Sequence, residues 1–106
     1  MIEIRLYLDE RGRSPFELWR ASLDPVTRAR ISRALERLAE GNTSNVKGLS
    51  GGVSEMKIDT GPGYRIYFGW EGKRFIILLG GGTKKRQQQD IGHALSRWED
   101  YKKRMS

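Results

Sequence analysis

Apolar and polar residues alternate from position 2 to position 8, and this period of two predicts a half-buried first strand. The polar segment Asp9–Arg13 is expected to turn the chain after it. Ser14–Glu17 has the capping serine, the proline and the glutamate that open a helix, so we expect a short helix through about Ala21. Asp24-Pro25 repeats this start signal and predicts a second helix.

The second helix, which Gly41 can end, has one apolar stripe at helical spacing. The stripe consists of Val26, Ile31, Ala34, Leu35 and Leu38. Four arginines fall mostly off it, and we expect them to form a solvated face: Arg28, Arg30, Arg33 and Arg37. Asn42–Asn45 is a loop of turn formers, and Val46–Gly52 is expected to lead into the sheet.

Three short strand patterns follow, joined by two hairpin signals. Val53–Thr60 and Tyr64–Trp70 alternate, with the turn Gly61-Pro62-Gly63 between them. Glu71-Gly72 predicts the second hairpin, and Phe75–Leu79 is apolar at every position, as in a strand buried on both faces. We expect the three glycines at 80–82 to end this strand.

A last helix is expected from about Gln87, because apolar residues then recur at helical spacing: Ile91, Ala94, Leu95, Trp98 and Tyr101. The order of elements is strand, helix, helix, three-strand antiparallel meander and helix. This order predicts one α+β domain over residues 1–106, with the helices on one face of the sheet and the other face free to bind.

The alternation also predicts which side chains share the free face. Met56, Ile58, Ile66 and Phe68 should point inward, whereas Lys57, Arg65 and Tyr67 should project from the exposed face. Lys84, Lys85 and Arg86 come directly after the third strand, close to the same face. Clustered cations beside a tyrosine form a surface suited to polyanions. A register slip of one residue would invert these assignments.

Composition and charge favour the same kind of ligand. Twenty lysines and arginines against thirteen acidic residues give a net charge of +7 and a pI near 10.1, as in many nucleic-acid binders. The excess lies in residues 46–106, with twelve basic and six acidic residues against eight and seven before them. Cysteine is absent, no apolar run is long enough to cross a membrane, and no signal peptide is evident, so we expect a cytoplasmic protein.

The common catalytic signatures are missing. His93 is the only histidine, and Gly80–Lys84 does not have P-loop spacing, so neither a metal nor another cofactor is expected. RNA can be cleaved without metal if a base deprotonates the 2′-hydroxyl and cations offset the charge on phosphate. The alternative is a solvated rim in which Glu55 or Asp59 simply pairs with Lys57 or Arg65.

A family resemblance adds to this interpretation. Glu55-x-Lys57, Gly63–Phe68, the apolar strand Ile77–Leu79, Gly-Gly-x-Lys84-Lys85-x-Gln87 and Asp90-Ile91-x-x-Ala94 together resemble the RelE/ParE toxin superfamily. The pattern is most similar to its phage-derived, HigB-type addiction module killer branch. The resemblance covers nearly the whole chain and implies a RelE-like fold and a type II toxin. It also implies a cognate helix-turn-helix antitoxin as partner and messenger RNA on the ribosome as target.

The resemblance implies roles for individual residues as well. Arg65 matches the strand arginine that contacts the scissile phosphate, and Lys84 and Lys85 match the paired lysines after the last strand. Lys57 stands where this branch often has a basic residue, and with Lys85 it is a candidate base. Nucleic-acid contacts are expected from Tyr67, Arg86, Gln87 and Lys47. The catalytic tyrosine or histidine of several relatives has no clear equivalent between Arg86 and Gln89.

Two alternative functions remain on the sequence alone. The first keeps the fold but poisons DNA gyrase, as in the ParE branch. The second is a nucleic-acid-binding module without catalysis, which predicts salt-dependent binding and no growth arrest.

Overall fold

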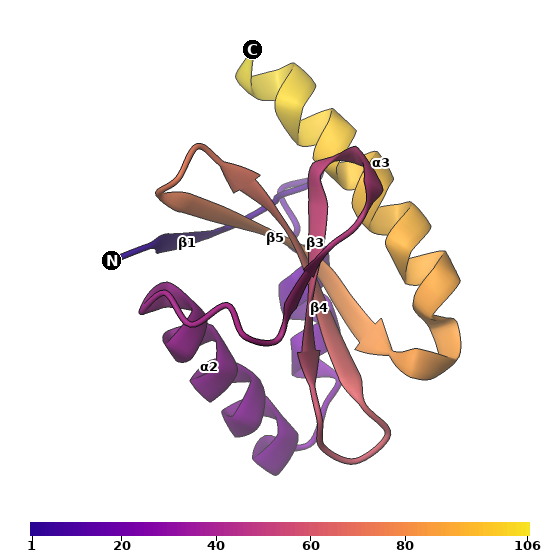
Figure 1. The fold of residues 1–106 in the computed structure, drawn as a ribbon. Coiled ribbons are helices and arrows are strands. Elements are labelled where there is room, and N and C mark those ends of the chain that lie inside the picture. Colours follow the sequence, from indigo (N-terminus) through magenta and orange to yellow (C-terminus); the bar gives the residue numbers. More distant parts are fainter.

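The computed structural model describes all residues, 1–106, and apart from one additional short strand its helices and strands follow the expected order (Figure 1). The chain begins with strand β1 and two helices and ends with one long helix, as the sequence predicts. The elements are β1 (Glu3–Leu6), α1 (Pro15–Ala21), α2 (Pro25–Ala39), β2 (Val46–Gly48), β3 (Val53–Ile58), β4 (Tyr64–Glu71), β5 (Phe75–Thr83) and α3 (Gln87–Met105). Short 3₁₀ turns, η1 (Ser50–Gly52) and η2 (Lys84–Arg86), precede β3 and α3.

The helix starts lie where the capping signals predict them. The Ser14 hydroxyl accepts a hydrogen bond from the Glu17 N–H at 3.0 Å and opens α1. The Asp24 carboxylate accepts one from the Thr27 N–H at 3.3 Å and opens α2. Helix α2 ends just before Gly41, whose φ of +97° few other residues adopt.

One five-stranded sheet has the order β1-β5-β4-β3-β2. Strands β3, β4 and β5 form the expected antiparallel meander, and β1 pairs in parallel with β5. The sequence did not predict β2, a three-residue strand that pairs with β3 along the other edge. Residues 46–48 have too few positions for any periodic pattern, so only tertiary pairing identifies them as a strand.

Helices cover both faces of the sheet, so the expectation of one free face is wrong. Figure 1 shows α2 and α3 on opposite sides of the strands. One core lies on the α1–α2 side and includes Phe16, Ile31, Leu38, Ile66 and Phe68. A second core lies under α3 and includes Val53, Tyr67, Leu79, Ala94 and Trp98. Strand β5 explains the arrangement, because its apolar side chains alternate between the two cores and both sets need cover.

The first strand is shorter than the alternation predicts. It ends at Leu6, and the Leu6 and Leu8 side chains are exposed. Tyr7 is buried instead, and its hydroxyl donates a hydrogen bond of 2.6 Å to the Asp100 carboxylate of α3. The alternation had predicted the opposite, with the leucines buried and Tyr7 exposed. Tyr7 can be buried in the core under α3 because it is amphipathic and its hydroxyl has a hydrogen-bond partner there.

Strand β5 continues through Gly80, Gly81 and Gly82 to Thr83, so the prediction that these glycines end the strand is wrong. Leu79 is an extra residue in the ladder between β4 and β5, since Tyr67 pairs with Gly80 and Phe68 with Leu78. The glycines let other elements approach the backbone closely. A Cβ at Gly81 would collide with the Trp19 ring of α1, and one at Gly80 would lie 2.7 Å from the Arg97 guanidinium of α3.

Gly81→Ala should therefore lower the free energy of unfolding by about 1–3 kcal/mol, because the added methyl forces Trp19 away from the strand. Gly92→Ala is the matched control. Gly92 lies within α3 with nothing near its Cβ position, so the same change there should raise the free energy of unfolding by about 1 kcal/mol. Urea denaturation measures both values. An unchanged free energy of unfolding for Gly81→Ala would show that the Trp19 ring does not pack against Gly81.

Candidate nucleic-acid interface

The expected site residues on the sheet lie in two cross-strand rows. Lys57 is opposite Arg65, which is opposite Gly82. In the next row on the same face, Lys47 is opposite Glu55 and Glu55 is opposite Tyr67. The prediction that Lys57 and Arg65 share a face is confirmed, and Met56, Ile66 and Phe68 lie in the core on the other side, with Ile58 packed against it.

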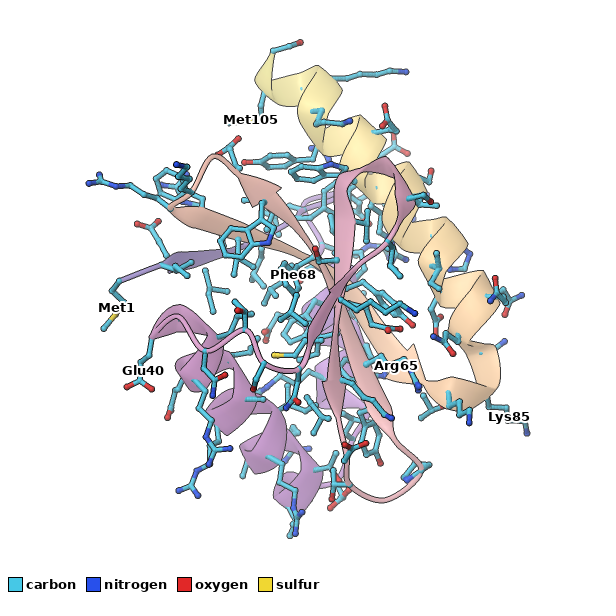
Figure 2. All side chains as sticks on the ribbon, viewed as in Figure 1. Met1, Glu40, Arg65, Phe68, Lys85 and Met105 are labelled. Atoms are coloured by element: carbon cyan, nitrogen blue, oxygen red, sulfur yellow. The ribbon has the colours of Figure 1, made fainter.

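The exposure expected for two of these residues is wrong. Arg65 is only 7% exposed and Tyr67 is fully buried, because α3 covers their part of the face. Figure 2 labels Arg65 on the side of the sheet where α3 lies. A contact between Tyr67 and a nucleic acid would require α3 to move.

Arg65 lies beside a buried carboxylate. Its Nε is 3.2 Å from Oε1 of Glu55, and the Gln87 amide in the first turn of α3 donates a 2.9 Å hydrogen bond to the same oxygen. Despite this ion pair, the buried Nε–H is not directed at the carboxylate for a hydrogen bond, and the buried Nη1 group has no hydrogen-bond partner either. A buried guanidinium with unused donors is a group that an additional anion can satisfy.

The Tyr67 hydroxyl also lacks a partner in the same layer. Burial, together with the negative charges of Glu55 and Asp90, raises the pKa of Tyr67 to about 12. The phenol is therefore neutral near pH 7 and cannot act as a base there.

The remaining predicted cations are exposed around this buried centre. The Nζ of Lys57 lies 3.4 Å from Oδ1 of Asp59. This ion pair is exposed and contributes little to stability. Lys84, Lys85 and Arg86 form η2, at the junction of β5 and α3, where Figure 2 labels Lys85. The Lys84 N–H donates to the Gly63 carbonyl oxygen at 3.3 Å, which ties η2 to the turn between β3 and β4. Lys47 is exposed on the edge strand β2.

Two polar residues of α3 lie at the site although the sequence analysis assigned them no role there: Arg97, and Asp90, which appeared only in the family motif. Arg97 donates a 2.9 Å hydrogen bond to the Leu79 carbonyl oxygen at the bulge, and burial lowers the pKa of Arg97. Asp90 packs against Gly82, and burial raises the pKa of Asp90 despite the nearby cations. Asp90 and Arg97 follow Gln87 at helical spacing and share the side of α3 that carries Ala94. Polar residues on this predicted apolar stripe were the available signal that polar groups are buried under α3. His93 is exposed on α3.

The site therefore consists of a buried arginine with unused donors, a carboxylate beside it and five exposed cations at its margin. Such a set can bind a phosphate group and offset charge that develops on it. No group of three or more histidine, cysteine or acidic residues is placed to hold a metal ion.

Comparison with known proteins defines the family. Residues 19–99 match the model of the family described as "Phage derived protein Gp49-like". The chain belongs to this Gp49-like family. A Haemophilus influenzae protein described as uncharacterized is 36% identical over 80 residues, which cover 74% of this chain and 81% of that protein.

The fold of this Gp49-like chain is that of the toxin RelE. The free form of an E. coli RelE mutant with two arginines changed to alanine superposes with a TM-score of 0.63. The match covers 91% of this chain and 96% of the RelE chain at 18% sequence identity. The RelE-like α+β architecture predicted from the sequence is thereby confirmed. None of the helices is both long and apolar enough to span a bilayer.

Tyr67→Phe tests whether the tyrosine hydroxyl has any role in the free protein. Since this buried group has no partner, its removal should raise the free energy of unfolding by about 1 kcal/mol. Chemical denaturation of the two proteins at the same pH measures the difference. A loss of stability would instead identify a hydrogen-bond partner for the hydroxyl.

Proposed function

We propose that this Gp49-like protein is the toxin of a type II toxin–antitoxin pair and a ribosome-dependent, metal-independent messenger-RNA endoribonuclease of the HigB type. The observation that carries this proposal is Arg65, a buried strand arginine with unused donors, with exposed cations on the neighbouring strand β3 and in η2. The RelE fold supports it, and the site would act in the cytoplasm, where ribosomes are.

The proposed chemistry is an internal transfer at one phosphate. A base takes the proton from the 2′-hydroxyl, and the 2′-oxygen bonds to phosphorus. The bond from phosphorus to the 5′-oxygen breaks, leaving a 2′,3′-cyclic phosphate, and the 5′-oxygen takes up a proton. Arg65 and Lys84 would bind the phosphate oxygens and offset their charge.

Lys57 and Lys85 remain the proposed bases, and the geometry adds Glu55 as a third. Lys57 is the cross-strand partner of Arg65, so it lies next to any phosphate held there. Glu55 contacts both Arg65 and Gln87 through one oxygen, which leaves its second oxygen to accept a proton. Lys47, Arg86 and Gln87 would contact the flanking nucleotides.

Access to Arg65 requires a local change in the free protein. Arg65 is only 7% exposed and its Nε and Nη1 groups are buried, so a phosphate cannot reach these donors directly, and the Glu55–Gln87 hydrogen bond ties the first turn of α3 to the same carboxylate. We propose that the substrate displaces this turn together with η2. The exposed lysines of η2 would meet the backbone first.

Glu55→Gln/Arg65→Gln should reduce messenger-RNA cleavage on translating ribosomes by at least about a hundredfold to a thousandfold, because the phosphate-binding group Arg65 is lost together with Glu55, a candidate base. The double change is needed since Arg65 is buried. Arg65→Ala alone would leave Glu55 buried without its partner and endanger the fold. Lys84→Ala and Lys85→Ala should each weaken cleavage less. Product ends are examined for the 2′,3′-cyclic phosphate.

Two controls make this result decisive. Circular dichroism establishes that each variant is folded, and Arg65→Lys, which keeps the charge, tests whether the planar guanidinium is needed. Full cleavage by the folded double variant would show that Arg65 has no role in cleavage. Intact RNA together with gyrase inhibition by the wild-type protein would favour the ParE-like alternative, and RNA binding without growth arrest would favour a non-catalytic module.

The proposed partner is a helix-turn-helix antitoxin encoded beside this protein. Co-expression of the neighbouring gene should restore growth and yield a complex that unfolds at a higher temperature than the toxin alone, because the antitoxin binds only the folded toxin. Size-exclusion chromatography and thermal denaturation check this. Persistent growth arrest without complex formation would count against the pairing.

A further inference from the structure

A second basic region lies on the other side of strand β3. A cavity of about 530 Å³ opens between α2 and the end of β3, and the loop before β2 borders it. Its lining includes Arg30, Arg33 and Arg37 of α2 and Lys57 of β3. Asp59 is the only acidic residue in this lining.

The positive charge of this cavity is largely unpaired. None of the three arginines forms a salt bridge, and Asp59 is engaged by Lys57 at 3.4 Å. Arg30 donates a 2.7 Å hydrogen bond to the neutral hydroxyl of Thr60. Like charges at neighbouring helical positions repel one another, so this arrangement does not stabilise α2. It is suited instead to an anionic ligand with several charges.

Spacing favours an extended ligand over a single small anion. Arg30, Arg33 and Arg37 are separated by three and four residues, so they lie along one side of α2 over about 10 Å. A row of guanidinium groups over that length can contact successive phosphates of one strand.

The rest of the lining favours a sugar–phosphate backbone over an acidic peptide. Only Ala34, Met56 and Ile58 are hydrophobic, which gives little area for the apolar anchors on which peptide recognition depends. Asparagine, serine and threonine side chains supply the remaining polar contacts, as in the part of a nucleic-acid interface that binds backbone oxygens.

Lys57 lies between this cavity and the Arg65 row, at the edge of strand β3. It lines the cavity and is also the cross-strand partner of Arg65. Strand β2 begins at Val46, so the edge of β3 beyond Lys57 carries no further strand. The two basic regions therefore meet at the uncovered end of one strand.

We propose that the cavity between α2 and β3 binds the phosphate backbone of a single-stranded RNA whose adjoining segment reaches Arg65. The connection to Arg65 rests on the proposed nuclease function, but binding in the cavity does not depend on cleavage. The cavity would hold the nucleotides that flank the reacting phosphate and would contribute affinity without sequence preference.

The test measures binding of a short, fluorescein-labelled single-stranded RNA by anisotropy over a range of salt concentrations. The proposed cleavage needs the ribosome, so the free oligonucleotide stays intact. Arg33→Ala/Arg37→Ala should weaken binding at every salt concentration and reduce the slope of log K against log salt by about 1.4, since each lost phosphate contact removes about 0.7. Both residues are exposed, so the fold should persist, which circular dichroism checks.

Lys73→Ala/Arg74→Ala is the matched control. These exposed residues lie in the hairpin at the opposite end of β4 from Arg65, and the double change removes the same charge. The control should leave the slope unchanged. Equal slopes for both double variants, or no RNA binding by the wild-type protein, would overturn the proposal.

Two further measurements distinguish the RNA site from an acidic-peptide site and from the nuclease function. A polyglutamate peptide that binds the wild-type protein but not Arg33→Ala/Arg37→Ala, while RNA binding is unaffected, would overturn the proposal in favour of an acidic protein partner. Ribosomal cleavage is assayed separately. A reduced salt slope for Arg33→Ala/Arg37→Ala, without any cleavage by the wild-type protein, would support the RNA site and contradict only the nuclease function. Cleavage by the wild-type protein, with an unchanged salt slope for the double variant, would contradict only the RNA site.

Discussion

The fold depends on the need to bury both faces of strand β5. From Phe75 to Leu79 every side chain is apolar, and those from Ile76 onward are almost entirely removed from solvent. One set packs against α1 and α2, and the other requires α3. The position of α3 then decides the character of the site, because the same helix that completes the core also covers Arg65 and Tyr67.

Local signals in the sequence predicted most of the architecture. Ser14 and Asp24 open their helices as expected, and the alternation in β3 and β4 correctly predicted that Lys57 and Arg65 lie on the same face of the sheet. Helix caps and strand alternation depend only on residues that are neighbours in the chain, so they can be recognised in a single sequence. The family resemblance added the RelE-like arrangement, and the superposition with RelE confirms it.

The errors concern contacts between distant segments. The three glycines after Leu79 were expected to end the strand, whereas they allow Trp19, Arg97 and Asp90 to approach a strand that continues to Thr83. The burial of Arg65 could not be predicted either, because it follows from where α3 crosses the sheet. Gln87, Asp90 and Arg97 on the apolar side of the last helix were the one visible sign that polar groups are buried there.

The oxygen that Glu55 shares between Arg65 and Gln87 makes the sheet and the last helix thermodynamically linked. An anion that draws Arg65 away from Glu55 changes the stability of the first turn of α3, and therefore the affinity of this turn for a second ligand. By reciprocity, that second ligand changes the affinity of Arg65 for the anion by the same factor. A molecule that binds only the start of α3 could therefore tighten or weaken phosphate binding without touching the phosphate site.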